Sequence, residues 1–332
     1  MSYRLFRQTI QPQSAFLTPL QSDTLFGHLM WSLRYLEGEG KLKEFLERYR
    51  SGPPPLLISR GMPQGYLPVP VMPSLPRQER LTLIEELWRS SSTANQRVAV
   101  ELLREATHRD WLPLDLWQQL VNGLSPCALF KLLLEKERPD PHSKALVVTR
   151  TAVDRITSSG REGQLFVKDE TFYPEDQPFD IWFKLSEEAI AEGLLDRLNE
   201  WWMGIEATGF GHRKSSGAGA FRRVGDVEPA DGQLPTAGQP NAFATLSAYV
   251  PKPGDPVEGY YRTRIKRGKL GEGYALPKPW KKPLIMLAPG SIFRTDGAEV
   301  ADYYGQLVKG IHWTIEGIVQ YAYAFPLPVR LG

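Results

Sequence analysis

The residues best suited to chemistry lie in one glycine-rich segment, GFGHRKSSGAGAF, between Gly209 and Phe221. It combines four glycines and two serine hydroxyls with three potentially cationic side chains. Glycine lets the backbone approach a ligand closely, and successive backbone N–H groups beside cations can bind an anion. A plain surface turn is the competing interpretation. We predict a loop that binds a polyanion, with these contacts: His212, Arg213, Lys214, Ser215 and Ser216.

The order of residues in this segment excludes two familiar phosphate loops. A Walker loop ends in Gly-Lys followed by Ser or Thr, whereas Lys214 here precedes the last glycines. A dinucleotide fingerprint needs Gly-x-Gly-x-x-Gly between a strand and a helix, and that pattern is absent here. A mononucleotide-binding enzyme is therefore not expected.

A basic and aromatic stretch between Tyr260 and Lys282 is the second candidate site. It has a local charge of +7, in a chain whose net charge is only +2. Tyrosines and Trp280 alternate with the cations, and in single-strand binding cations hold phosphates while rings stack on bases. A solvated loop with core aromatics is an equally open interpretation. The candidate RNA contacts here are Arg262, Arg264 and Lys266.

A third candidate lies between Val148 and Phe166, where arginines and hydroxyls share a Gly- and Ser-containing stretch. Such side chains commonly contact phosphate and ribose. A structural ion pair between Asp154 and Arg155 is the simpler alternative. The candidate contacts are Arg150, Asp154 and Arg155.

Composition narrows the class of protein. The 332 residues suffice for two domains, and 42% hydrophobic with 11% aromatic residues indicates a folded chain. Cys127 is the only cysteine, and the five histidines are too far apart for metal-ligand spacing. We expect no disulfide, metal site or cofactor. The first residues lack the apolar core of a signal peptide and no apolar run is long enough for a membrane span, so a cytoplasmic protein without membrane contact is expected.

The hydrophobic pattern predicts an α+β fold. A strand at 3–10, a helix with an apolar stripe from Leu25 to Leu36, strands at 163–173 and 179–185, a helix after Ser186 and a last strand at 219–224 give a split βαβ order. Residues 77–138 have helical periodicity throughout and are expected to form an all-helical insertion. Residues 1–225 would form the first domain, 226–240 a linker, and 241–332 a second domain.

Several motifs together resemble one family. DTLFGH at 23–28, VDRIT at 153–157 and the glycine-rich segment resemble the RAMP superfamily of CRISPR-associated proteins. APGSIF at 288–293 and YAYAFPLP at 321–328 are similar to the fourth subunit of type III-A Csm effector complexes. The resemblance runs nearly end to end, although 77–138 carries no recognised motif.

The resemblance implies two ferredoxin-like, RRM-type βαββαβ domains, the first with the helical insertion. It implies a non-catalytic subunit that binds the repeat-derived 5′ tag of CRISPR RNA and meets target RNA through the guide duplex. Its protein partners would be the large polymerase-domain subunit and the backbone RAMP subunit. Asp23 and Thr24 would lie near the RNA path, and a hairpin at 163–173 would form a thumb with Leu165 and Phe166 as wedge residues.

Two other functions stay open. Some RAMP proteins are metal-independent endoribonucleases that process CRISPR precursor RNA by general acid–base chemistry, for which His28 and His212 are the candidates. A pure assembly protein would instead use the 77–138 helices and the aromatic C-terminus, and would touch no RNA.

Overall fold

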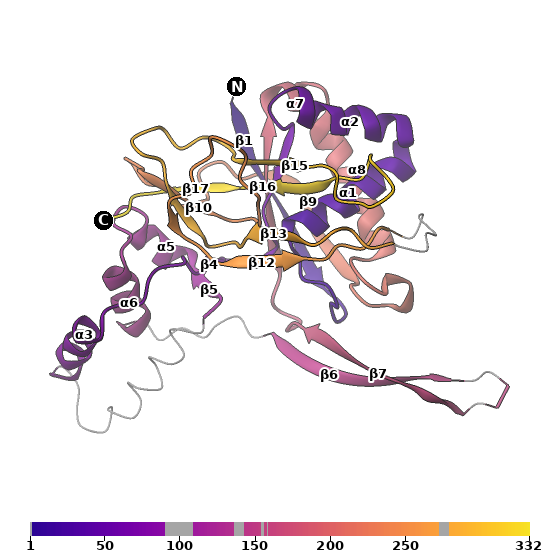
Figure 1. Ribbon diagram of the computed structural model, residues 1–332, viewed down its shortest axis with the longest axis horizontal. Coiled ribbons are helices and arrows are strands. Elements are labelled where there is room, and N and C mark those ends of the chain that lie inside the picture. Colours follow the sequence, from indigo (N-terminus) through magenta and orange to yellow (C-terminus); the bar gives the residue numbers. More distant parts are fainter. Residues whose placement is uncertain (1, 90–108, 136–142, 154–155, 158, 272–278) are drawn as a thin grey trace.

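The computed structural model describes residues 2–89, 109–135, 143–153, 156–157, 159–271 and 279–332 (Figure 1). Its largest sheet has the antiparallel order β2 (Leu56–Ile58), β8 (Phe179–Ser186), β1 (Tyr3–Pro12), β9 (Phe221–Pro229), and β3 (Met62–Pro63) also pairs with β8. Four helices accompany it: α1 (Ser22–Glu37), α2 (Glu39–Ser51), α7 (Glu187–Ala191) and α8 (Leu194–Thr208). The order β1-α1-β2-β8-α8-β9 agrees with the expected order in β1, α1, β8, α8 and β9, but β2 takes the place expected for the strand at 163–173, which lies outside this sheet.

Hydrophobic burial explains why these segments pair. In β8 every residue except Lys184 is buried, as expected for a strand covered on both faces. Helices α1 and α8 turn their apolar stripes inward, so Leu29, Leu33, Leu198 and Trp201 are fully buried. The predicted mixture of helices and antiparallel sheets is confirmed, and the sheet places α1 and the end of α8 beside the start of β9.

The C-terminal part consists of strands. A four-stranded sheet has the order β11 (Gly259–Tyr260), β14 (Ile292–Arg294), β10 (Ala242–Thr245), β17 (Pro326–Val329). Two ribbons flank it, one of β12 (Thr263–Lys266) with β13 (Leu284–Leu287), the other of β15 (Gly305–Val308) with β16 (Gln320–Tyr323). The described residues of 241–332 contain no helix, so a second βαββαβ domain stays a prediction.

Two predicted boundaries are corrected. The expected linker at 226–240 begins inside β9, because Glu228 and Pro229 still pair with β1 and the Asp231 carboxylate accepts the Leu5 N–H. The insertion is not all-helical. Its described parts are α3 (Arg77–Arg89), α5 (Leu114–Leu120), α6 (Pro126–Glu135) and β5 (Trp111–Pro113), which pairs with β4 (Tyr66–Pro68) and buries Leu112.

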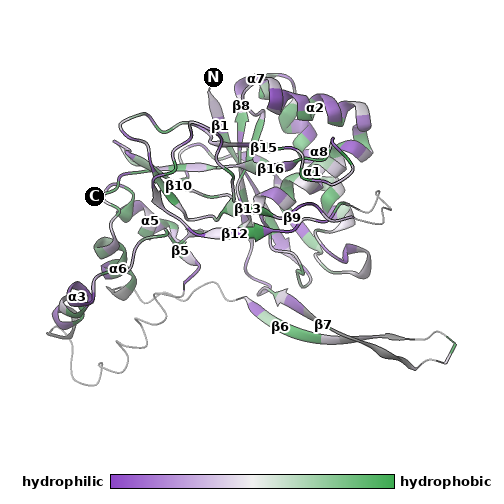
Figure 2. Ribbon diagram, viewed as in Figure 1, coloured by the Kyte–Doolittle hydropathy of each residue, from purple (hydrophilic) through white to green (hydrophobic). Residues whose placement is uncertain are grey.

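A long hairpin of β6 (Lys144–Val153) and β7 (Gly160–Phe172) extends away from the rest of the protein (Figure 1). The predicted hairpin at 163–173 is therefore only its second strand, because these residues pair with β6 rather than with each other. Reciprocal backbone hydrogen bonds of 2.9 and 3.0 Å between Phe16 and Thr171 attach the hairpin root to the body. Near its root, β6 carries hydrophobic residues (Figure 2). Val147 and Val167 are 69% and 60% exposed.

Close packing of α1 on α8 gives a test of the fold. A methyl group at Gly204 in α8 would lie 2.3 Å from the Ser32 hydroxyl of α1, which donates a hydrogen bond to the Trp201 carbonyl. We expect Gly204→Ala to lower the free energy of unfolding by about 1–3 kcal/mol in urea titrations, despite the better helix propensity of alanine. Gly27→Ala in α1 is the control, because a Cβ added there would meet no other part of the protein within 4 Å. This substitution should raise the free energy of unfolding by about 0.5–1 kcal/mol. Equal stabilisation by both substitutions would contradict this packing.

Candidate nucleic-acid interface

The glycine-rich segment folds into a tight loop between α8 and β9. Gly209, Gly211, Gly217 and Gly219 all have φ between 70° and 82°, a conformation that side chains disfavour. At Gly219 an added Cβ would lie 1.9 Å from the Phe210 carbonyl oxygen, so glycine is required there by space as well as by backbone conformation. Arg213, at the centre of the loop, adopts φ of 60°.

Most backbone N–H groups of this loop already have partners inside the protein. Gly211 donates to His28 Nε2 at 3.0 Å, and His212 donates to the Thr18 hydroxyl at 3.0 Å. The N–H groups of Phe210, Ser216, Gly217, Ala218, Gly219 and Ala220 also donate to oxygens of the protein. Many of the N–H groups expected to cradle an anion are thus used to hold the loop in shape, and those of residues 213–215 at its tip are not among these donors.

The side chains expected to bind the anion come together at the loop tip. A 3₁₀ turn, Lys214–Ser216, presents His212, Ser215 and Ser216 as exposed and Arg213 and Lys214 as partly exposed. Two permanent cations and two hydroxyls on a rigid tip match the side chains that contact RNA phosphates. The side chains predicted to bind an anion therefore lie together at the loop tip, and anion binding there stays a prediction.

His28, in helix α1, contacts the glycine loop. Its ring lies 4.7 Å from the Phe210 ring, and its Nε2 accepts the Gly211 N–H. Burial, and secondarily the charge of Lys214, lowers the pKa of His28 to about 4. A neutral imidazole whose Nε2 lone pair is already occupied is poorly suited to serve as a general base, so its role here is to position the loop.

Three other predicted site residues meet in the interior. The Asp23 side chain is fully buried and lies 2.6 Å from Lys266 Nζ, which also donates to the Thr24 hydroxyl at 2.8 Å. Gln320 Nε2 donates to the same carboxylate at 2.8 Å. Because the Asp23 side chain is buried in an ion pair between α1 and β12, it is not placed to contact RNA. Removing one member of such a pair leaves an uncompensated buried charge.

Lys281 extends this network. Its Nζ donates to the Val319 carbonyl and to Gln320 Oε1, at 2.8 and 3.0 Å. Burial lowers the pKa of Lys281 to about 8, against the opposing effect of the Asp23 charge. Part of the basic cluster found in the sequence is therefore used inside the protein.

The rest of the basic cluster remains on the surface of the β12–β13 ribbon. Arg262, Arg267 and Lys269 are exposed, whereas Arg264 is partly buried. Lys269 Nζ lies 5.8 Å from the Trp280 ring centroid, and Lys282 Nζ lies 5.1 Å from that of Trp313. Both tryptophans are more than half exposed. Cations next to exposed rings suit a single nucleic-acid strand.

The hairpin residues are less fully described. Asp154 and Arg155 lie outside the described residues. Arg150 pairs with Phe166, and Thr151 with Leu165, across the two strands of the hairpin. Arg150, Leu165 and Phe166 thus share one short stretch of the hairpin. The glycine loop belongs to a different segment of the chain.

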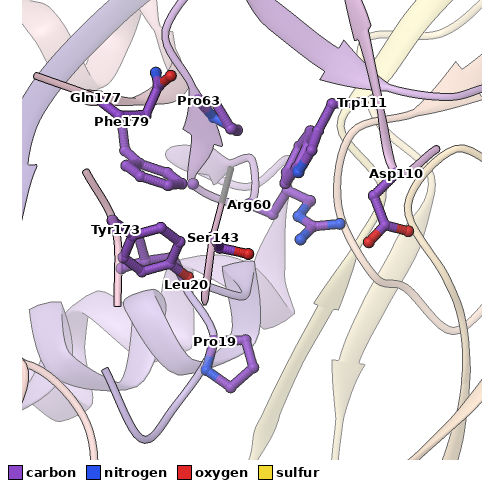
Figure 3. Close-up of a pocket in the computed structure, with 11 residues that line it drawn as sticks. Pro19, Leu20, Arg60, Pro63, Asp110, Trp111, Ser143, Tyr173, Gln177 and Phe179 are labelled. Carbon is purple, nitrogen blue, oxygen red and sulfur yellow. The ribbon is translucent and has the colours of Figure 1, made fainter. Parts of the chain in front are cut away.

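Sequence reasoning missed a cavity of about 170 Å³ at the hairpin root. Figure 3 shows Tyr173 and Phe179 on one side of it and Arg60 with Trp111 on the other. These side chains come from separate segments of the chain, so no local spacing could have revealed them. In the sequence, Arg60 and Trp111 each stand among hydrophobic residues and prolines. Such neighbours predict burial but do not indicate a site.

Within the described residues, no helix has the length and apolar character that crossing a bilayer requires. The same part of the chain contains no group of three or more His, Cys, Asp or Glu residues placed to hold a metal ion.

Comparison with known proteins shows which fold this is. No protein-family model and no curated protein matches the chain. A chain from a crystal structure of a Csm1–Csm4 cassette with pppApA superposes with a TM-score of 0.56 at 18% identity, covering 99% of both chains. The chain has the fold of a Csm subunit. A crystal structure of the type III-A Csm3–Csm4 subcomplex also matches, with a TM-score of 0.55 at 14% identity, covering 98% of this chain and 99% of the other. This likeness in fold to structures from type III-A Csm complexes agrees with the resemblance inferred from the motifs.

The buried His28 predicts a pH dependence of stability. The pKa of a histidine in the unfolded chain is about 6.5, above that of folded His28, so between about pH 6.5 and 4 only the unfolded state takes up this proton. Stability should fall as the pH drops through this range, by up to about 3 kcal/mol from His28. Urea titrations at pH 4 to 7 should show a weaker dependence in His28→Gln. The same slope in both proteins would contradict the assignment.

Proposed function

We propose that this chain is a non-catalytic, Csm4-like subunit of a type III-A CRISPR RNA-guided effector complex. The observation that carries the proposal is the nearly full-length fold match to two different complexes, Csm1–Csm4 and Csm3–Csm4. Csm4 is the component that both complexes contain. The DTLFGH, VDRIT and glycine-rich motifs support the same assignment, as does the ferredoxin-like strand order of the first sheet.

The ligand we propose is the repeat-derived 5′ tag of the guide RNA. The glycine loop supplies Arg213 and Lys214 on a rigid tip, and the β12–β13 ribbon supplies exposed cations with Trp280 and Trp313. Phosphate contacts would provide affinity, and exposed rings would stack on bases. The hairpin, with Leu165 and Phe166, would meet target RNA at the guide duplex.

The proposed protein partners are the large polymerase-domain subunit and the backbone RAMP subunit. Uncovered hydrophobic side chains support such docking: on the adjacent helices α1 and α8, Tyr35, Leu36 and Met203 are 68%, 55% and 56% exposed. Where such side chains join into one apolar patch, they mark contact sites. These contacts alone would also suit a pure assembly protein, so RNA binding must be measured directly.

The first test concerns charge. Replacing Arg213 and Lys214 by Ala should weaken binding of a tag RNA and lower the magnitude of the slope of log K against log salt by about 1.4, because each phosphate contact on single strands contributes about 0.7. Filter binding or fluorescence anisotropy at several salt concentrations measures both. The matched control is Lys41→Ala with Lys43→Ala on α2, whose side chains are 57% and 75% exposed. If the loop variant and the control bind identically at every salt concentration, the loop is not the RNA site.

The second test separates binding from cleavage. Purified protein incubated with repeat RNA in EDTA should leave the RNA intact on a denaturing gel, because His28 Nε2 is occupied and the pKa of that ring is lowered to about 4. Specific cleavage that disappears in His28→Ala or in His212→Ala would instead establish a metal-independent endoribonuclease.

A further inference from the structure

The cavity at the hairpin root is lined by side chains that the proposed function does not yet use. Its volume of about 170 Å³ corresponds to roughly six water molecules at about 30 Å³ each. A cavity of this size admits one aromatic ring system, as an engineered cavity of about 150 Å³ admits benzene. It is too small for a drug-sized ligand, which needs at least about 300 Å³.

The lining combines rings with both hydrogen-bond donors and acceptors. Arg60 lies over the Trp111 ring, with its Cζ 4.4 Å from the ring centroid. Opposite them, the rings of Tyr173 and Phe179 meet edge to face with centroids 4.6 Å apart (Figure 3). Asp110 and Gln177 add a carboxylate and an amide.

Arg60 has unused hydrogen-bonding capacity. Its Nε is buried and has no hydrogen-bond partner among the described residues. Burial lowers the pKa of this guanidinium to about 10, so it stays charged at neutral pH. As a residue of the cavity wall, Arg60 brings a positive charge next to any acceptor that enters the cavity.

The same lining distinguishes between ligand classes. A phosphate would gain from Arg60 but would be repelled by the Asp110 carboxylate. A nucleobase has flat faces for the rings and carries acceptors and donors on its edge, as Arg60 and Asp110 require. A purely apolar ligand would place no acceptor beside Arg60. The lining therefore favours a nucleobase.

The cavity lies where the candidate RNA elements converge. Pro19 and Leu20 of its wall follow Thr18, whose hydroxyl accepts the His212 N–H of the glycine loop. Tyr173 directly follows the last residue of β7. The charge of Arg264 on β12 is close enough to lower the pKa of Arg60. An RNA strand that runs from the glycine loop to the β12–β13 ribbon would pass the opening of this cavity.

We propose that the cavity formed by Arg60, Asp110, Trp111, Tyr173 and Phe179 takes up a single unstacked base of the bound RNA. This inference rests on the proposed RNA-binding function and extends it from phosphate contacts to recognition of one base. The rings stack on the base, Arg60 donates to an acceptor on its edge, and Asp110 accepts from a donor.

The test is a scan for the captured base. Full-length protein is titrated with a synthetic tag RNA and with a series in which each nucleotide in turn is replaced by an abasic one. One position should lose affinity by between about 5-fold and 100-fold, the range expected for loss of a stacked base. In Trp111→Leu that position should lose less than about 2-fold. Asp110→Ala, at an exposed residue, is a second variant that keeps the core intact and should also reduce the loss.

Each outcome has a distinct meaning. If the native protein binds the RNA but all abasic positions behave alike, or if both variants keep the full loss, the cavity holds no base and only this inference fails. If the native protein does not bind the RNA at all, the proposed function fails and this inference with it. Calorimetry with AMP, GMP, CMP and UMP separates the sources: binding of a free nucleotide without any sensitive position in the RNA would overturn capture of an RNA base.

Discussion

A buried charge at the start of helix α1 determines how the two parts of the chain meet. Asp23 has no exposed side-chain surface, and its carboxylate is compensated by Lys266 from β12 at 2.6 Å and by Gln320 from β16 at 2.8 Å. A buried carboxylate is tolerated only when paired and hydrogen-bonded, and its position in the first helical turn adds a favourable interaction with the helix dipole. The ribbon that carries the exposed cations is therefore held against the helix that supports the glycine loop.

Helix α1 contacts both the glycine loop and the C-terminal strands, using a different face for each. One turn after Asp23, the Phe26 ring stacks on Tyr321 at 4.5 Å, which joins the helix to β16. His28, on another face, accepts the Gly211 N–H and packs on Phe210. The motif DTLFGH thus works mainly as a structural hub. Its residues contact both the loop and the ribbon, and so link these two elements.

How far the sequence could predict this structure depends on the range of the interactions. Strands β1 and β8 and helices α1 and α8 were predictable because each has a local pattern of apolar residues with its own period. The pairing of β6 with β7 and the end of β9 were not, because strand register depends on partners elsewhere in the chain. Lys266 was expected on the surface as an RNA contact, yet it bonds Thr24 across 242 residues. The backbone N–H groups of the glycine loop were likewise expected to be free, whereas Thr18 and His28 occupy two of them from far along the chain.

These internal contacts change how the charge of the chain should be understood. A local charge of +7 suggested a broad basic surface between Tyr260 and Lys282. The structure directs Lys266 and Lys281 inward, where they bond Asp23, Thr24, Val319 and Gln320. The cations left for a ligand are fewer and stand next to exposed rings, as Lys269 does with Trp280 and Lys282 with Trp313. Since electrostatic attraction alone is insensitive to sequence, cations that stand beside exposed rings are better suited to holding bases than cations alone would be. The internal hydrogen bonds of the glycine loop fit the same reasoning, because holding the contacting side chains in place before binding reduces the entropy lost on binding.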